Sequence, residues 1–362
     1  MATHFHPLEI KDIRNETPDC ISVSFIIPAH LKSQFTFIQG QNITIKTNID
    51  GETLRRSYSV CSSPMDNELR IAVKKVNNGK FSSWAGSYLK KGIILEVLPP
   101  SGKFYTALDA GNKKNYIAFA AGSGITPLLS IIKTTLLTEP ASRFTLVYGN
   151  KNRASIIFKE ELEALKNKFI SRFSIHHILS REMAETPLNH GRIDAEKCAT
   201  IFSRITDIKS CDEFFLCGPE AMIFGVKNYL EQQGVEKKKI HFELFTVPGQ
   251  KNTEAGNPDT ELKKVYPGKV SNIMIKLDGV SFDFNLAYDG ETILDAALAL
   301  GADLPFACKG GVCSTCRAKL LAGEVMMDNN YALEPEEIKN GEILTCQSHP
   351  RSEKIFIDFD IK

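Results

Sequence analysis

The sequence of 362 residues lacks the features that mark several special classes of protein. It has no run of about 18 apolar residues, so we expect no transmembrane helix. Its start, MATHFHPLEIKDIRNET, has no apolar signal-peptide core, which predicts a cytoplasmic protein. A formal net charge of only +1 gives no electrostatic reason to expect a nucleic-acid partner. The composition is that of an ordinary globular protein, and the length suggests two or three domains.

The sequence also shows no sign of a disulfide framework or of a histidine-based metal site. The nine cysteines are odd in number, which argues against a disulfide framework in a chain without a signal peptide. The eight histidines show no carboxylate-bridged metal pattern, so we do not expect the chain to activate dioxygen itself. The sequence has no internal repeat and no low-complexity tract. The functional signal must therefore come from local motifs.

Three regions differ in their hydrophobic patterns. Residues 1–109 alternate short apolar runs with Gly and Pro turns, which predicts an antiparallel β-barrel or sandwich. Residues 110–249 alternate buried strands with amphipathic helices, which predicts a doubly wound, mostly parallel α/β sheet. Residues 250–268 are rich in Gly, Pro, Asn and charge, which predicts a linker. Residues 269–362 begin with two alternating strands and a helix, and we expect them to form a third domain.

Charge separates this third domain from the rest of the chain. Residues 269–362 carry 9 Lys and Arg against 15 Asp and Glu, whereas residues 1–268 carry 35 against 28. Opposite net charges favour docking of the acidic domain on the basic body or on a charged partner. The alternative is that two solvated surfaces differ by chance.

Three of the cysteines lie in one short loop, CKGGVCSTC (308–316), and Cys346 follows in LTCQSHP. The gaps of four and two residues between the first three cysteines, with a distant fourth, are the plant-type spacing for a [2Fe–2S] cluster. Gly310 and Gly311 can adopt positive φ and let the chain wrap closely, so that amide N–H groups point at the sulfurs. A structural zinc site and a thiol redox switch are the alternatives.

A glycine turn, AGSGITP (121–127), lies between a predicted buried strand and a predicted helix. Gly122 and Gly124 would let the backbone approach a ligand closely, while Thr126 could cap the helix and Pro127 suits its first turn. The N–H groups and dipole at the start of such a helix attract a diphosphate. A second turn, Cys217–Pro219, follows another strand, and together the turns predict a ligand crevice at one edge of the sheet. Either turn alone could be a simple strand-to-helix connection.

The segment LRRSYSVCSSP in the first region suggests a flavin site. Arg56 and Tyr58 would share one face of a strand, where an arginine can pair with phosphate and a tyrosine can lie against a flat ring. Ser59 could hydrogen-bond the edge of that ring. Residues 79–83 open a predicted helix whose N–H and hydroxyl groups could bind a diphosphate. Taken singly, Arg56 reads as a surface charge and Tyr58 as a core aromatic.

These motifs resemble a known family over essentially the whole chain. RRSYS, AGSGITP and CGP look like the flavin and nucleotide signatures of the ferredoxin–NADP reductase superfamily, and the cysteine loop with Cys346 is similar to a plant-type ferredoxin domain. The order of the domains fits the branch that contains reductase components of multicomponent oxygenases. Within it, YGN (148–150), HGRID (190–194) and NNYALEPEEI resemble reductase subunits of phenylacetyl-CoA epoxidase (ring 1,2-epoxidase) complexes.

The resemblance implies a fold and a set of site residues. The expected architecture is a multidomain one, with an FAD-binding antiparallel β-barrel, an NAD(P)-binding α/β sheet and an α+β β-grasp ferredoxin domain. The implied FAD site consists of Arg56, Tyr58, Ser59, Val73, Lys74, Gly79, Lys80, Phe81 and Ser82. The implied nucleotide site consists of Gly122, Gly124, Thr126, Pro127, Ser180, Arg181, Cys217, Gly218 and Pro219. The implied cluster ligands are Cys308, Cys313, Cys316 and Cys346.

Catalytic roles are implied for Tyr58, Ser59, Cys217 and Phe245. Phe245 would cover the isoalloxazine ring until the nicotinamide displaces it, although it could also be a last core aromatic. Ser180 and Arg181 resemble a pair that grips the 2′-phosphate, which favours NADPH over NADH because arginine suits bidentate phosphate pairing. Arg181 could equally be a solvated loop charge.

The function implied by the resemblance is electron transfer. Electrons would pass from NAD(P)H through FAD and the [2Fe–2S] cluster to a partner oxygenase, a di-iron subunit acting on phenylacetyl-CoA. Three alternatives stay open at this point. They are a reductase of another oxygenase or a desaturase, a non-enzymatic redox carrier or sensor, and a zinc-stabilised binding protein.

Overall fold

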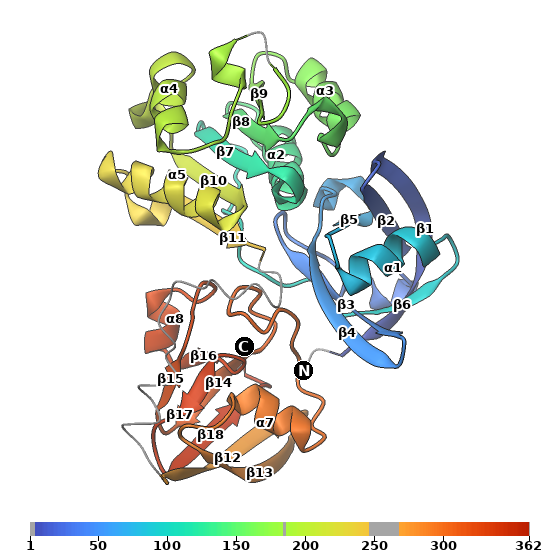
Figure 1. The fold of residues 1–362 in the computed structure, drawn as a ribbon, viewed down its shortest axis with the longest axis vertical. Helices are drawn as coiled ribbons and strands as arrows, with labels where there is room; N and C mark the ends of the chain where they lie inside the picture. The colour runs from blue at the N-terminus through green and yellow to red at the C-terminus, as the bar shows by residue number, and fades with distance from the viewer. Residues whose placement is uncertain (1–3, 184–185, 246–267, 362) are drawn as a thin grey trace. The chain divides into compact units, whose positions relative to one another are not determined.

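The computed structural model describes residues 4–183, 186–245 and 268–361 (Figure 1). These residues form two compact units, one of residues 6–54 with 58–245 and the other chiefly of residues 268–361. Within the described ranges, no helix has both the length and the hydropathy needed to cross a membrane. The predicted linker lies outside the described residues except for Gly268.

The first part of the larger unit is an antiparallel barrel. Its strands follow the order β4-β3-β6-β1-β2-β5, and a bridge between Val60 and Ile71 joins the two ends of this sheet. Alternating apolar side chains of the strands fill the interior, with Leu8, Ile43 and Val97 fully buried. The strands are β1 (His6–Thr17), β2 (Cys20–Ile26), β3 (Asn42–Ile49), β4 (Glu52–Ser59), β5 (Leu69–Lys74) and β6 (Ile94–Val97), and α1 (Lys80–Tyr88) follows β5.

The second part of this unit is a parallel sheet of order β11-β10-β7-β8-β9 with helices on both faces. Adjacent residues of a strand point to opposite faces, so Phe215 packs against Tyr116 on one side while Phe214 meets Phe202 on the other. The strands are β7 (Asn115–Ala121), β8 (Arg143–Asn150), β9 (Phe173–Leu179), β10 (Glu213–Gly218) and β11 (Ile240–Leu244). The helices are α2 (Ile125–Thr138), α3 (Lys159–Lys168), α4 (Ala195–Arg204) and α5 (Glu220–Gln232).

Helix α2 also fastens the sheet to the barrel. The Ser130 hydroxyl donates to the carbonyl of Ser62 at 2.6 Å, and the hydroxyls of Ser63 and Thr134 lie 2.9 Å apart. These buried hydrogen bonds join the middle of α2 to the chain that leaves β4. The barrel and the sheet therefore meet along the element that carries the glycine turn.

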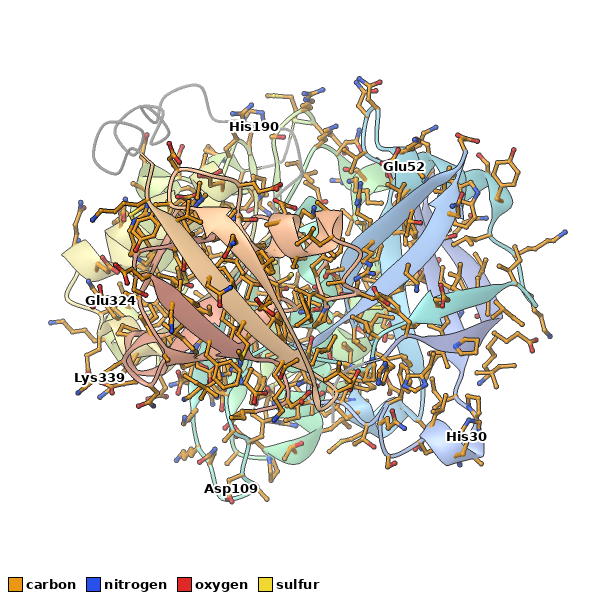
Figure 2. All side chains as sticks on the ribbon, turned by 90° about the horizontal axis from the view of Figure 1, so that it is seen from below. His30, Glu52, Asp109, His190, Glu324 and Lys339 are labelled. Carbon is orange, nitrogen blue, oxygen red and sulfur yellow. The ribbon has the colours of Figure 1, made fainter. Side chains whose placement is uncertain are left out.

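The smaller unit is a mixed five-stranded sheet of order β13-β12-β18-β14-β16 with a helix, α7, packed on it. Charged side chains such as those of Glu324 and Lys339 project from its surface (Figure 2). Its strands are β12 (Val270–Leu277), β13 (Val280–Ala287), β14 (Arg317–Ala322), β15 (Val325–Met327), β16 (Glu342–Leu344), β17 (Ser348–Pro350) and β18 (Lys354–Asp358). Its helices are α7 (Ile293–Ala299) and α8 (Pro335–Lys339).

The three predicted architectures are confirmed: a barrel, a doubly wound sheet and an α+β ferredoxin-like domain. We did not predict α4, β14 or β16 from the sequence. Helix α4 has a clear signal there, the Asp194 N-cap followed by Cys198 and Ile201 at helical spacing, and we missed it. Strand β16 has only three residues, too few for apolar alternation to distinguish it from a loop.

Candidate active site and cluster loop

The two predicted nucleotide turns meet at one edge of the parallel sheet. Strands β7 and β10 are neighbours, and both end at this edge. A Cβ atom on Gly124 would lie 2.0 Å from the carbonyl oxygen of Cys217, and one on Gly218 would lie 3.1 Å from the amide of Ala121. The glycines therefore allow the backbones of the two turns to touch, which no larger residue would permit.

The start of α2 differs from the sequence prediction. Thr126 was expected to cap the helix, but Gly124 occupies the N-cap position and makes no side-chain cap. The Thr126 hydroxyl instead donates to the carbonyl of Ser123 at 3.0 Å, because Thr126 already lies inside the first turn. Pro127 does lie in that turn, as predicted. The start of α2 thus has no side-chain cap, although its first amide, that of Ile125, is already bonded to the carbonyls of Gly122 and Ser123 in the short 3-10 turn before it.

A contact between the barrel and the last strand of the sheet brings three polar residues together. The Ser59 hydroxyl, at the end of β4, donates to Oε2 of Glu243 in β11 at 3.0 Å. Glu243 is the register partner of Cys217 in the neighbouring strand β10. Ser59 and Cys217, predicted from separate motifs, therefore meet through Glu243.

Glu243 was not singled out from the sequence. It lies in HFELF, directly before Leu244 and Phe245, and a single acidic residue in a mostly apolar strand was the available signal. Cys217 is completely buried, and burial together with the Glu243 carboxylate raises the pKa of its thiol well above the ordinary value. Cys217 therefore stays a neutral thiol, and Glu243 is the group here that can hold a charge or a proton.

The predicted flavin residues come from three elements of the barrel. Tyr58 in β4 is half-buried and lies 5.5 Å, centroid to centroid, from the ring of Phe81 in α1. Phe81 and Val73 are core residues with 1% and 2% exposure, so only their backbone groups can serve a ligand. Arg56 donates to the carbonyl of Arg55 at 2.7 Å, and Lys74 lies 3.6 Å from the carboxylate of Asp19.

The start of α1 is shaped by Gly79 and Ser82. The Ser82 hydroxyl accepts from the amide of Val76 at 3.0 Å, so this hydroxyl already holds the loop that leads into the helix. A Cβ atom on Gly79 would lie 2.5 Å from it. Lys80, at the first helical position, forms an ion pair with Glu52. Ser82 therefore supports the loop, while the amides of the first turn are the groups that a diphosphate would use.

Ser180 and Arg181 lie just beyond the end of β9, at the same edge of the sheet as the glycine turns. The backbone amide of Ser180 donates to the carbonyl oxygen of Asn150 at 2.9 Å. The neighbouring Glu182 pairs with Arg153 at 3.3 Å. The guanidinium of Arg181 has no hydrogen bond or ion pair within the described part of the chain. Phe245, the last described residue before the linker, is 39% exposed.

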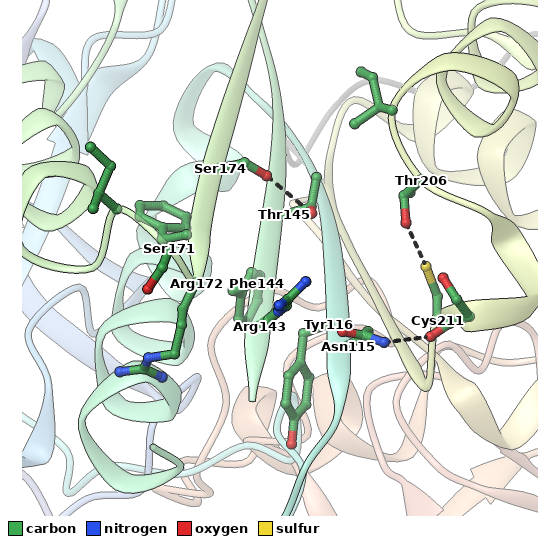
Figure 3. A pocket seen from close by; sticks show the side chains of 14 residues that line it. Asn115, Tyr116, Arg143, Phe144, Thr145, Ser171, Arg172, Ser174, Thr206 and Cys211 are labelled. Atoms are coloured by element: carbon green, nitrogen blue, oxygen red, sulfur yellow. Dashed lines mark hydrogen bonds between the residues drawn. The ribbon is translucent and has the colours of Figure 1, made fainter. Parts of the chain in front are cut away.

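A pocket of about 440 Å³ lies at the opposite edge of the sheet (Figure 3). It is lined by the first residues of β7, β8 and β9, and hydrogen bonds such as Ser174 to Thr145 at 3.1 Å cross its wall. No residue that the sequence predicts for flavin or nucleotide lines it. Ligands of doubly wound sheets bind at the carboxyl ends of the strands, so this pocket is not the predicted site.

The four cysteines of the smaller unit come together as two pairs. The sulfurs of Cys308 and Cys313 are hydrogen-bonded to each other, and so are those of Cys316 and Cys346. Across the residues that the structure describes, no three His, Cys, Asp or Glu side chains converge as a single metal ion would require. Two pairs of thiolates suit a cluster of two irons.

Backbone amides surround these sulfurs. The amide of Gly310 donates to the Cys308 sulfur at 3.3 Å. The pKa of Cys308 is lowered by the hydrogen bond from Cys313 and by such amides, and the pKa of Cys346 is lowered in the same way by Cys316. Each pair therefore loses its first proton more readily than an isolated buried thiol would.

The loop adopts left-handed backbone at three positions, of which only one was predicted. Gly311 has a φ of +75°, as expected, but Gly310 does not have a positive φ. Lys309 and Ser314 do, with values of 51° and 56°. The amide of Gly310 serves the Cys308 sulfur, but its backbone conformation does not require a glycine.

Comparison with known proteins bears on all three parts of the chain. Residues 7–105 match the family model of an oxidoreductase FAD-binding domain, residues 119–228 that of an oxidoreductase NAD-binding domain, and residues 275–351 that of a 2Fe-2S iron-sulfur cluster binding domain. The chain is 42% identical to one component of the 1,2-phenylacetyl-CoA epoxidase of Escherichia coli (strain K12), over 99% of both chains.

The chain belongs to the ferredoxin–NADP reductase superfamily, in its branch of oxygenase reductases with a C-terminal [2Fe–2S] domain.

Other relatives extend this picture. The reductase is 32% identical to the ferredoxin reductase component of the 3-ketosteroid-9-alpha-monooxygenase of Rhodococcus rhodochrous, over 97% of this chain and 96% of the relative. Its fold resembles that of phthalate dioxygenase reductase, with a TM-score of 0.57, 24% identity and 98% of each chain covered. The reductase is therefore an electron-transfer flavoprotein that uses FAD, a nicotinamide nucleotide and a [2Fe–2S] cluster.

The cysteine loop of the reductase fits such a cluster. The Thr315 hydroxyl is buried and has no oxygen or nitrogen partner among the described residues, and it lies beside the Cys313 sulfur. A Cβ atom on Gly311 would lie 2.8 Å from the carbonyl oxygen of Asn329, so the loop closes tightly there. Thiolates, inward amides and a spare hydroxyl are the donor set that a [2Fe–2S] cluster needs.

Proposed function

We propose that this reductase takes electrons from NADPH and delivers them to an oxygenase that acts on phenylacetyl-CoA. The observation that carries the proposal is the full-length likeness to the epoxidase component of Escherichia coli, which extends through all three domains. The acceptor would be a separate di-iron oxygenase subunit.

The chain's own residues bind and orient the cofactors. When bound, FAD supplies two-electron chemistry with the nicotinamide and one-electron chemistry with the cluster. Tyr58 would lie against the flavin ring, Arg56 would pair with its phosphate, and the first amides of α1 would bind its diphosphate. Val73, Lys74, Gly79, Phe81 and Ser82 complete this proposed site, Phe81 and Val73 through their backbones.

The carboxyl edge of the parallel sheet would bind the nicotinamide nucleotide. The positive end of the α2 dipole would attract the diphosphate, and Gly124, which packs against the Cys217 carbonyl, places no side chain there. Arg181 would pair with the 2′-phosphate, because its neighbour Glu182 is already neutralised by Arg153. Phe245 would cover the flavin ring in the absence of nucleotide.

Beside this site, Glu243 can hold a proton and Ser59 can relay it. Their hydrogen bond gives Ser59 a fixed orientation toward the strand end that carries Cys217. We propose that Glu243 holds the proton that a reduced flavin would exchange, with Ser59 as its relay. In the smaller unit, we propose that Cys308, Cys313, Cys316 and Cys346 hold the cluster.

The domain boundaries and the location of the protein also belong to the proposal. We propose an FAD domain of residues 1–109, a nucleotide domain of residues 110–249, a linker of residues 250–268 and a cluster domain of residues 269–362. The matched family regions lie inside these boundaries. A cytoplasmic location is supported by nine cysteines that are all free, as suits a reducing compartment.

An anaerobic titration with NADPH and then NADH tests the electron path. We expect the flavin absorbance to bleach and a rhombic paramagnetic signal of the reduced cluster to follow, faster with NADPH. A bleached flavin with a loaded but silent cluster would contradict the path, and equal rates with the two nucleotides would contradict the role of Arg181.

Reconstitution with purified oxygenases tests the partner. The likeness to the Rhodococcus steroid monooxygenase component supports a second candidate, a reductase for another oxygenase. Turnover of phenylacetyl-CoA with its epoxidase but not of ketosteroid with its monooxygenase is expected. The reverse result would favour the second candidate.

A further inference from the structure

The side chain of Gln347 joins the segment that carries Cys346 to the loop that carries Cys308. Its amide nitrogen donates to the carbonyl oxygens of Lys309, at 2.9 Å, and of Cys346, at 2.8 Å. Its amide oxygen accepts from Nδ2 of Asn329 at 3.2 Å. Gln347 is 7% exposed, so both amide hydrogens and the oxygen are satisfied inside the protein.

Residues 329–331, which are bonded to Gln347 through Asn329, hold the loop as well. The amide of Tyr331 donates to the carbonyl of Gly311 at 3.0 Å. A Cβ atom on Gly311 would lie 2.8 Å from the carbonyl oxygen of Asn329 and 3.2 Å from Cγ of Gln347. Residues 309–311 therefore pack closely against a unit formed by Gln347 and this second segment.

The held part of the loop is also the part with unfavourable backbone. Lys309 has a φ of 51°, which a lysine adopts only when its surroundings compensate. Its ammonium pairs with Asp295 at 2.5 Å and lies 4.9 Å from the centre of the Phe306 ring. The bond from Gln347 to the Lys309 carbonyl adds a third restraint at the same residue.

The hydrogen bond from Gln347 to the Lys309 carbonyl connects the two pairs of cysteines. Cys308 pairs with Cys313, whereas Cys346 pairs with Cys316. The bonds of Thr345 to Cys316 stay within one pair, but Gln347 links the segment of one pair to the loop of the other. Gln347 thus restrains the separation of the two pairs.

We propose that Gln347 is a positioning residue that clamps the Cys308 loop to the Cys346 segment and so fixes the geometry of the bound [2Fe–2S] cluster. The proposal rests on the proposed cluster ligands. A glutamine suits the role because its neutral amide supplies two donors toward two carbonyls and one acceptor toward Asn329. A carboxylate or an apolar side chain of the same length would leave those carbonyls without their donor.

The test uses the full-length protein with its cofactors. Gln347→Met keeps the length of the side chain but removes its hydrogen bonds, and Gln347→Glu keeps the acceptor but removes both donors. We expect an iron chelator to bleach the cluster about tenfold faster in both variants, since each lost buried hydrogen bond is worth a few-fold in an equilibrium. The paramagnetic signal of the reduced cluster should also shift in both, which a general loss of stability would not produce.

Two further variants keep the test decisive. Gln39→Met removes another buried glutamine, also 7% exposed, whose amide donates to Thr106 in the larger unit, and it should bleach at the wild-type rate. Asn329→Ala changes an exposed side chain and should bleach about twofold faster, because it removes one restraint on Gln347.

The outcomes separate the clamp from the cluster assignment. A wild-type bleaching rate and signal in Gln347→Met, or the same acceleration in Gln39→Met, would overturn the clamp while leaving the ligands intact. If Gln347→Met does not fold, an unchanged rate in Asn329→Ala overturns it instead. A wild-type chain that loads no cluster would overturn the ligand assignment and the clamp together.

Discussion

The two proposed sites, the nucleotide turns and the cysteine loop, both bring backbone groups close together, but they do so in opposite ways. At the turns, a missing side chain allows two strand ends to touch, since a Cβ atom on Gly124 would lie 2.0 Å from the carbonyl of Cys217. In the loop, the chain instead curves back on itself, with left-handed backbone at Lys309, Gly311 and Ser314. One site depends on long-range packing and the other on local conformation.

This difference implies that the two sites can be damaged separately. A substitution in the loop should remove the cluster and leave hydride transfer to the flavin intact. A substitution at the turns should weaken nucleotide binding and leave the cluster in place.

The largest effect is expected from Cys316→Ala. Cys316 is 2% exposed and pairs with Cys346, so its loss removes one ligand of the proposed set. We expect no paramagnetic signal from a [2Fe–2S] cluster and a fall of partner reduction to background, while NADPH still bleaches the flavin. Absorbance and paramagnetic resonance on the same sample measure both.

Cys198→Ala is the matched control. Cys198 is also fully buried, but it lies in α4 and outside both sites. The variant should keep its cluster at the wild-type level. A cluster that survives in Cys316→Ala, or is lost in both variants, would show that Cys316 is not a ligand.

The local character of the loop explains why a short stretch of sequence is enough to predict a cluster site there. Three of the four cysteines and their spacing lie within nine consecutive residues, and two strands of the same domain, β12 and β18, show apolar alternation in the sequence. The sequence did not reveal which residues take positive φ, because Lys309 is held in that conformation by Asp295 and Phe306, whose positions depend on the fold.

The nucleotide turns show the limit of the same reasoning. Their glycines were predicted, but Thr126 was wrongly expected to be the cap because the helix start could lie one or two residues either way. Glu243 was missed because its partner, Ser59, is 184 residues away in sequence. No local pattern links a barrel strand to the last strand of the sheet.

The second largest effect is expected from Glu243→Gln. The amide keeps the size of the side chain but cannot accept the proton that a reduced flavin loses as it is reoxidised. We therefore expect the rate of electron transfer from reduced flavin to the cluster to fall about 100-fold, with little change in hydride transfer or nucleotide affinity. Anaerobic stopped-flow absorbance measures the rate. Glu213→Gln, at the opposite edge of the sheet, should keep the wild-type rate, and an unchanged rate in Glu243→Gln would refute the proton role.

Gly124→Ala tests the packing of the turns directly. The new methyl group would meet the Cys217 carbonyl, so we expect a loss of about 1–3 kcal/mol in stability and weaker nucleotide binding. Gly225→Ala in α5 is the control, because its Cβ meets nothing within 4 Å and should stabilise the helix by up to about 1 kcal/mol. Thermal unfolding and nucleotide titration distinguish the two, and equal behaviour would contradict the close contact.

Arg181→Ala should have a selective effect on the nucleotide site. A guanidinium that binds a phosphate contributes about 1.5–3 kcal/mol, so NADPH affinity should fall about tenfold to a hundredfold. NADH affinity should not change, because NADH has no 2′-phosphate. Equal loss for both nucleotides would mean that Arg181 supports the loop rather than the phosphate.

The smallest effect is expected from Glu213→Gln, at the opposite edge of the parallel sheet and far from the turns. Glu213 lies 2.9 Å from Nε2 of His241 and 2.8 Å from Nζ of Lys114. Burial raises the pKa of Glu213, but these hydrogen bonds outweigh it and hold the pKa below its ordinary value of 4.5. The carboxylate therefore stabilises the fold above pH 4.5, and this contribution is lost as the pH falls through the lowered pKa.

Comparison of the wild type with Glu213→Gln isolates this contribution. Asp12 and Glu68, whose pKa values are lowered beside Arg70, titrate in both proteins and cancel in the difference. We expect the free energy of unfolding of the wild type to exceed that of the variant by less than about 1 kcal/mol at pH 7, and the gap to close as the pH falls below about 4. Urea unfolding at several pH values measures it. A gap that persists at low pH would show that the amino edge of the sheet is held by packing rather than by charge.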